Sequence, residues 1–156
     1  LMARDPQGYY YVIDVVHGRW TAHERASIIK QTAALDRTRA VTEWLVPEPS
    51  IYIEQAPGLA QEPTLDLVRQ LAGYVVYADR VTKDKQSRAT PFQAQAQAGN
   101  VKLIAGAWNK SYLDELTSFP TGKHDDRVDS SSGAFNKLAE GIGLEYGDNP
   151  LEGYRG

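Results

Sequence analysis

Segments that favour strands and segments that favour helices alternate along this chain, and their order limits the folds it can adopt. An apolar run at residues 1–4 and a β-branched and aromatic run at residues 9–16 flank the turn Asp5-Pro6-Gln7-Gly8, which predicts an antiparallel hairpin. Further strand-like runs lie at residues 51–54, 74–77 and 101–104. Helix-like segments separate them, so the order predicts an α/β fold with a mixed sheet, an antiparallel hairpin edge and flanking helices.

Five segments are predicted to be helical, at residues 21–36, 63–72, 92–98, 108–119 and 125–138. Thr21 with Glu24 three residues later has the pattern of a capping box. Gly73 is expected to stop the second helix, and Pro91 to take the first position of the third. Residues 79–88 are expected to form a charged loop.

Length and composition indicate one ordinary soluble domain. The 156 residues suit a single core, which we expect over residues 1–140, with a Gly-, Asn- and Pro-rich tail at 141–156 that is ordered only in part. No apolar run approaches ~18 residues, and no charged-then-apolar leader opens the chain. The absence of cysteine excludes disulfides and thiolate zinc sites.

Charge argues against a protein that holds nucleic acid by bulk electrostatics, because the net charge is −3. Four cations are nevertheless clustered and are opposed only by Asp84; they are Arg80, Lys83, Lys85 and Arg88. Two interpretations stay open: a local patch that faces phosphate, or a solvated charged loop.

Acidic residues mark two places where a cation could bind. Glu54 ends an apolar strand, where sites in α/β sheets gather, although it could simply mark the return of the chain to water. Asp125, Asp126 and Asp129 lie beside His124 at the front of the last helix. Interaction with the helix dipole explains one or two acids there, but three repel one another unless a cation or basic partner lies among them. Carboxylates from a strand end and a helix start are typical of a Mg²⁺ site.

Several other kinds of site are excluded. His17, His23 and His124 lack zinc-type spacing, and Asp14, on the hairpin strand, is not expected to be a primary ligand. No Ser/His/Asp elbow or dinucleotide fingerprint is present, and Gly122-Lys123 lacks the rest of a phosphate loop, so nucleotide hydrolysis is not expected in this chain.

Most of residues 1–140 resemble the nuclease domain of the large terminase subunit of tailed bacteriophages. The acidic segment at residues 122–129, Gly-Lys-His-Asp-Asp-Arg-Val-Asp, is the most specific part of this resemblance. The other segments that carry it are Tyr11–Trp20, Ile51–Gln55, Arg69–Tyr74 and Ala98–Leu103.

The resemblance implies a ribonuclease H-like fold whose acidic cluster binds Mg²⁺ or Mn²⁺ and hydrolyses DNA phosphodiesters. Carried over by position, Glu54 is the second acid of that family, and Asp125 and Asp126 form its third site. Asp129 is a supporting metal ligand. The first acid of the family stands on a first strand that we expect this chain to lack, and its absence would leave this chain inactive by itself.

The resemblance also implies the partners of the site. Double-stranded DNA would meet Lys83, Lys85 and Arg88 on a DNA-facing loop without being read for sequence. Arg80, Lys123 and His124 are further candidates for DNA contact. The terminase ATPase domain, the small terminase subunit and the portal are implied protein partners, in the host cytoplasm.

The sequence therefore predicts a metal-dependent endonuclease domain of a viral DNA-packaging terminase, cutting concatemeric DNA with little sequence specificity. Two alternatives remain open. One is a resolvase- or integrase-type enzyme on the same fold. The other is a catalytically silent module that binds DNA or docks the motor.

Overall fold

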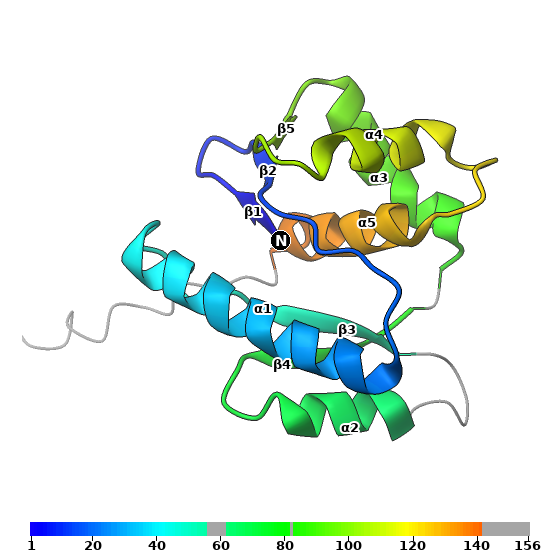
Figure 1. Cartoon of the computed structure of the whole chain (residues 1–156). Helices are drawn as coiled ribbons and strands as arrows, with labels where there is room; N and C mark the ends of the chain where they lie inside the picture. Colours follow the sequence, from blue (N-terminus) through cyan, green and yellow to red (C-terminus); the bar gives the residue numbers. More distant parts are fainter. Residues whose placement is uncertain (56–61, 82, 142–156) are drawn as a thin grey trace, which may run out of the picture. The chain divides into compact units, whose positions relative to one another are not determined.

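The computed structural model describes residues 1–55, 62–81 and 83–141, which fall into two compact units (Figure 1). One unit contains residues 1–16 and 83–141, and the other contains residues 17–81. No helix in these ranges has the length and apolar character needed to cross a membrane. The domain boundary at residue 140 stays a prediction, and the tail expected after it lies outside the described residues beyond Gly141.

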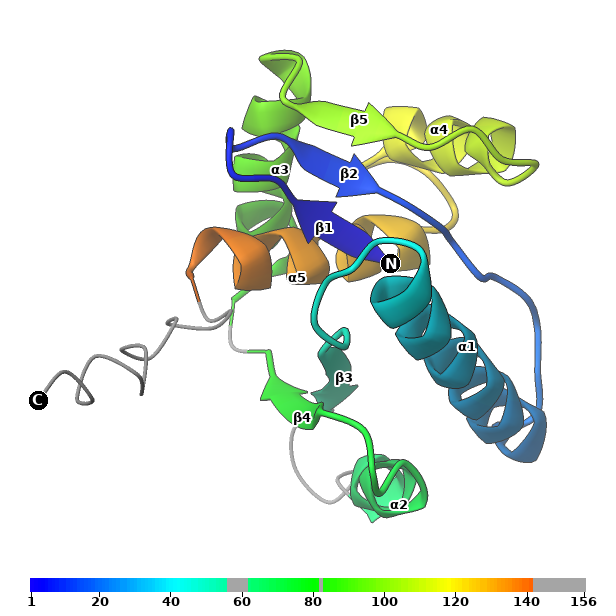
Figure 2. The ribbon, with the colours of Figure 1, turned by 90° about the vertical axis from the view of Figure 1, so that its left-hand side faces the viewer.

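The first unit contains a three-stranded mixed sheet. Strand β1 (Met2–Arg4) pairs antiparallel with β2 (Tyr10–Val12), and β2 pairs parallel with β5 (Val101–Leu103), so β2 lies in the middle (Figure 2). Gly8 allows the tight β1–β2 turn because its φ of +95° is one that residues with a Cβ rarely adopt. The predicted hairpin at the edge of a mixed sheet is confirmed.

Three helices complete this unit: α3 (Lys85–Gln97), α4 (Asn109–Ser118) and α5 (Asp126–Ala139). Helix α5 packs against α3, α4 and β1. The core between them is aromatic, with the Phe135 ring centroid 4.5 Å from that of Tyr10 and 5.7 Å from that of Phe92. These buried contacts set the position of α5 relative to α3.

The second unit contains two parallel strands joined through a helix. Strands β3 (Ile51–Gln55) and β4 (Val76–Arg80) pair in register from Ile51 opposite Val76 onward, and α2 (Glu62–Gln70) packs against both. The rings of Tyr52 and Tyr77 stack at 5.1 Å on this pair. Helix α1 (Ala22–Thr42) donates a hydrogen bond from Arg37 Nη1 to the Gly73 carbonyl at 3.2 Å.

Helix α1 begins as predicted and ends later than predicted. The Thr21 hydroxyl accepts from the Glu24 N–H at 3.3 Å, and the Glu24 carboxylate accepts from the Thr21 N–H at 2.8 Å, which confirms the capping box. The expected end near Asp36 is wrong, because Asp36 is itself buried and the buried stripe continues from Ala33 to Ala40 at helical spacing.

Strand β4 lies further along the chain than the predicted segment at residues 74–77. Helix α2 ends at Gln70, before the expected stop at Gly73, and Gly73 lies in the turn that follows with a φ of +100°. The Tyr74 N–H donates to the Leu71 carbonyl at 3.1 Å in this turn. This turn delays the strand to Val76 and extends it to Arg80, because pairing with β3 sets the register. Asp79 and Arg80 are therefore strand residues and not loop residues.

The expected charged loop at residues 79–88, with Pro91 opening the third helix, is also wrong. Helix α3 begins at Lys85, and Pro91 lies inside it. The Asp84 carboxylate caps the helix by accepting from the Ser87 N–H at 2.9 Å and from the Ser87 hydroxyl at 2.6 Å. Pro91 has no backbone N–H, so the helix lacks one hydrogen bond, the one to the Ser87 carbonyl. The helix tolerates Pro91 because only this bond is lost and the first turn is already well capped.

Candidate metal centre

The Asp125 side chain, at the start of α5, does not cap its own helix, because another residue satisfies the helix end. Asp125 is the N-cap residue of α5, yet its side chain makes no capping hydrogen bond. The Arg127 N–H in the first turn instead donates to Glu115 Oε1 of α4 at 2.6 Å. The Glu115 carboxylate of α4 therefore caps α5 in place of Asp125, and the Asp125 carboxylate can bind another partner.

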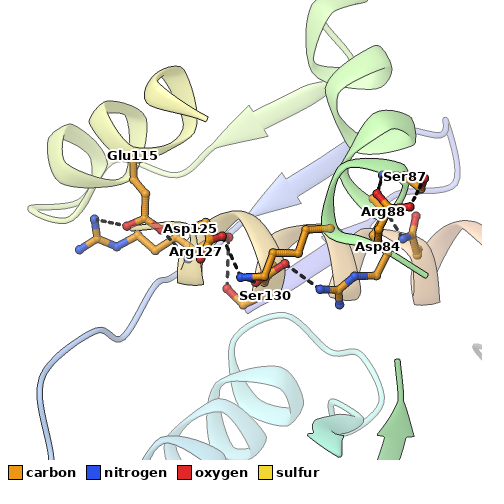
Figure 3. A network of polar contacts seen from close by, with 10 residues as sticks. Asp84, Ser87, Arg88, Glu115, Asp125, Arg127 and Ser130 are labelled. Carbon is orange, nitrogen blue, oxygen red and sulfur yellow. Dashed lines mark hydrogen bonds and ion pairs between the residues drawn. The ribbon is translucent and has the colours of Figure 1, made fainter. Parts of the chain in front are cut away.

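Glu115 is held in place by a buried ion pair. Its Oε2 lies 3.3 Å from Arg127 Nη1, and both side chains are almost fully buried. Arg127 Nη1 also donates to the Ser111 carbonyl at 2.6 Å. Figure 3 shows Glu115 and Arg127 meeting between α4 and α5. This pair connects the start of α5 to α4.

The carboxylates of Asp125 and Asp129 form ion pairs with two cations from α3. Lys85 Nζ lies 2.7 Å from Asp125 Oδ2 and 2.8 Å from Asp129 Oδ2. Arg88 Nη2 lies 2.7 Å from Asp129 Oδ1 (Figure 3). We call these four residues, Lys85, Arg88, Asp125 and Asp129, the charge cluster.

Helical spacing explains why the charge cluster forms. Lys85 and Arg88 are three residues apart at the start of α3, and Asp125 and Asp129 are four apart at the start of α5, so each pair shares a helix face. Hydrogen bonds to Asp125 and Asp129, assisted by their charges, raise the pKa of Lys85 well above its usual value. Lys85 therefore remains an ammonium at any physiological pH.

Asp125 and Asp129 have donor chemistry that fits a divalent metal. Their carboxylate oxygens already converge on one cationic nitrogen, and Mg²⁺ commonly uses one or two carboxylates together with water and substrate phosphate. Within the described ranges, no group of three or more His, Cys, Asp or Glu side chains is arranged to hold a metal. The described acids of this cluster could supply two protein ligands to one cation.

Three other predicted residues lie close in sequence to this cluster. Asp126 is exposed in the first turn of α5, and no hydrogen bond or ion pair to its carboxylate occurs in the described part of the chain. Lys123 and His124 are exposed on the segment that leads into α5. Their predicted roles in metal or DNA binding stay predictions.

Glu54 belongs to the other unit, so its predicted role beside the α5 acids stays a prediction. It is exposed on β3, and the register places it opposite Asp79 of β4. Arg80 Nε donates to the buried Gln55 Oε1 at 3.2 Å. Lys83 is exposed just before α3.

The sequence prediction missed both partners of the α5 acids. Asp84 followed by Ser87 is an N-cap signal in the sequence. A helix that starts at this cap has Lys85 and Arg88 on one face. Glu115 has no local signal, because its role depends on how α4 packs against α5.

Asp14, expected not to be a primary ligand, accepts a hydrogen bond from the Val15 N–H at 2.8 Å.

Comparison with known proteins gives one match. The model of a family described as a terminase RNaseH-like domain matches residues 1–138. No curated protein and no solved structure matches the chain. The matched range contains residues of both units and all four residues of the charge cluster.

Proposed function

Since the chain belongs to the family of terminase RNaseH-like domains, we propose that it is a divalent-metal-dependent endonuclease domain. It would hydrolyse phosphodiester bonds of concatemeric viral DNA with little sequence specificity, using Mg²⁺ or Mn²⁺. Family membership supports a terminase nuclease-type module in general. The observation that carries the finer proposal is the convergence of the Asp125 and Asp129 carboxylates on one cation.

The residues of the first unit would divide the work of holding that metal. Asp125 and Asp129 would supply oxygen ligands from α5, and Arg88 would orient Asp129 by holding its other oxygen. Glu115 would keep Asp125 available by capping α5 in its place. Positioning partners of this kind are typical of metal sites, where the groups behind the ligands fix their orientation.

A bound Mg²⁺ or Mn²⁺ would supply the activation of a water nucleophile and the stabilisation of the leaving oxygen. Glu54 and Asp126 are the further acids we propose for this site, on the basis of the sequence. The family resemblance places Glu54 as the second acid and Asp126 beside Asp125 in the third site, which is the reason to include them.

DNA contact would be local, since the chain carries a net charge of −3. Four cationic or neutral donors outside the charge cluster are the proposed phosphate contacts: Arg80, Lys83, Lys123 and His124. Contacts of this type position the duplex without reading its bases. The ATPase domain, the small subunit and the portal are proposed as protein partners on the basis of the family.

A second candidate function is a catalytically silent module that binds DNA or docks the motor. The observation that favours it is that Lys85 and Arg88 already neutralise Asp125 and Asp129. Acids paired in this way can be structural, holding α3 against α5. A resolvase-type activity would differ from both candidates by a preference for branched over linear DNA.

The test is cleavage of supercoiled plasmid DNA by the chain in Mn²⁺ and in EDTA. We expect nicking and linearisation in Mn²⁺ alone, at many sites. Asp125→Asn and Asp129→Asn should each reduce the rate at least about a hundredfold, because each removes a charged ligand. Glu54→Gln and Asp126→Asn should also reduce it, and intact cleavage in either would remove that residue from the site.

Asp114→Asn is the matched control, since Asp114 is an exposed aspartate of α4 that pairs only with Lys110 at 2.7 Å in the described structure. It should cleave like the unmodified chain. Cleavage only by a chain extended upstream to include the first acid would still support the nuclease, whereas DNA binding without cleavage by either chain would reject it and support the silent module. A preference for four-way junctions over plasmid would support the resolvase.

A further inference from the structure

The two cations of the charge cluster are held very differently. The Arg88 side chain is 11 % exposed and contacts one oxygen of Asp129, and its backbone carbonyl accepts from Asn136 Nδ2 of α5 at 3.2 Å. The Lys85 side chain is 50 % exposed and contacts both aspartates. Arg88 is therefore a buried part of the α3–α5 interface, whereas the Lys85 side chain is half exposed to water.

Lys85 uses the oxygens that a metal would need. Its ammonium lies between Asp125 Oδ2 and Asp129 Oδ2, the two oxygens that converge on one point. Arg88 takes the remaining oxygen of Asp129 and leaves that convergence point open. A metal and the Lys85 ammonium cannot both occupy this point.

The charge balance leads to the same conclusion. With Lys85 and Arg88 in place, two positive and two negative charges give a neutral cluster. While Lys85 is in place, these four residues offer a divalent cation little net attraction, and the Lys85 ammonium only a few ångströms away would repel it. Removal of Lys85 leaves a net charge of −1, which attracts the metal.

We propose that Lys85 is a built-in competitor of the metal, whose ammonium holds the two aspartate ligands together and must leave before a divalent cation can bind them. This inference rests on the proposed function, because it concerns the same two ligands. It assigns Lys85 to the regulation of metal binding and Arg88 to the positioning of Asp129. Metal binding and release of Lys85 are then one event.

The first experiment measures Mn²⁺ binding to the DNA-free chain by the electron paramagnetic resonance signal of free Mn²⁺. Lys85→Met keeps the apolar stem and removes the charge, so we expect it to bind Mn²⁺ about tenfold more tightly than the unmodified chain. Lys85→Arg, which retains the charge, should bind as weakly as the unmodified chain. Lys110→Met is the matched control, because Lys110 pairs with an aspartate outside the cluster, and it should leave the affinity unchanged.

The second experiment needs no variant of the cluster and therefore does not depend on how Lys85→Met folds. Acylation of each lysine amine is followed by mass spectrometry with and without Mg²⁺. Mg²⁺ should increase the labelling of Lys85 at least about twofold, because the ammonium loses its hydrogen bonds to the aspartates. The labelling of Lys110 should not change.

The outcomes separate this inference from the proposed function. Mn²⁺ binding that is abolished by Asp129→Asn, but is equal or weaker in Lys85→Met, would overturn the inference and leave the metal site intact. Lys85 labelling that Mg²⁺ leaves unchanged or lowers would overturn it as well. Absence of any Mn²⁺ binding that depends on Asp129, in the unmodified chain and in Lys85→Met, would overturn both.

Discussion

A single buried carboxylate, Glu115, decides what Asp125 is able to bind. Helix N-termini leave N–H groups without partners, and an aspartate at the N-cap usually satisfies one of them with its own side chain. Glu115 Oε1 accepts the Arg127 N–H instead, and its Oε2 meets the Arg127 guanidinium. The Asp125 carboxylate is thereby left to meet Lys85.

Glu115→Gln should lower the free energy of unfolding by about 1–3 kcal/mol, since it leaves the Arg127 guanidinium without its buried counter-ion. Urea unfolding followed by circular dichroism measures this change. Asp114→Asn on the neighbouring residue should change stability little, because Asp114 and its partner Lys110 are both largely exposed. Equal effects of the two substitutions would contradict a special role for Glu115.

At the scale of the element, the N-cap of α3 places Lys85 and Arg88 on a helix face, where the sequence predicts a loop. The sequence predicts that the helix starts at Pro91. Asp84 caps it seven residues earlier. The extra turns bring Lys85 and Arg88 onto the side that packs against α5. The expected DNA-facing loop is replaced by a helix end whose cations bind acids of the same chain.

The cap also makes the stability of α3 depend on pH. Hydrogen bonds from the Ser87 hydroxyl and N–H lower the pKa of Asp84 below its ordinary value. The stabilisation is therefore present above the unfolded pKa of about 3.9 and is lost as the pH falls through the lower folded value. Asp84→Asn retains a capping oxygen that does not titrate in this range.

We expect the unmodified chain to lose stability relative to Asp84→Asn as the pH falls below about 4, in urea unfolding measured between pH 3 and pH 6. Asp114→Asn serves again as the control, since it removes an acid that caps no helix. If the difference in free energy of unfolding between the unmodified chain and Asp84→Asn stays constant over this range, the Asp84 cap does not depend on ionisation.

At the scale of the whole molecule, the chain contains two α/β units, each with its own small sheet. The predicted acids come from both units, Glu54 from one and the α5 aspartates from the other. Lys85 and Arg88 are paired with acids in the charge cluster, and their predicted contact with DNA stays a prediction. Lys83 is exposed, and no ion pair to it occurs in the described part of the chain, so we expect it to contribute to DNA affinity.

Lys83→Gln should weaken binding to a short DNA duplex about equally for different sequences and reduce the slope of log affinity against log salt by about 0.9. Fluorescence anisotropy in EDTA measures this slope without cleavage. Lys110→Gln should leave the slope unchanged, because the Lys110 ammonium is paired with Asp114. Equal slopes for Lys83→Gln and the unmodified chain would remove Lys83 from the DNA contacts.

Local sequence was enough to predict the hairpin, the capping box at Thr21 and Glu24, the helix that starts among the aspartates, and the terminase family. The three structural features depend on residues within a few positions of one another, where periodicity and capping act directly. The family resemblance depends on the residue types of several short segments, each of which is read without knowing the fold. The Lys85 and Arg88 pairing with Asp125 and Asp129 was decided only by the tertiary structure. It depends on the Phe92 and Phe135 contact that packs α3 against α5, and no local pattern encodes which distant helix faces will meet.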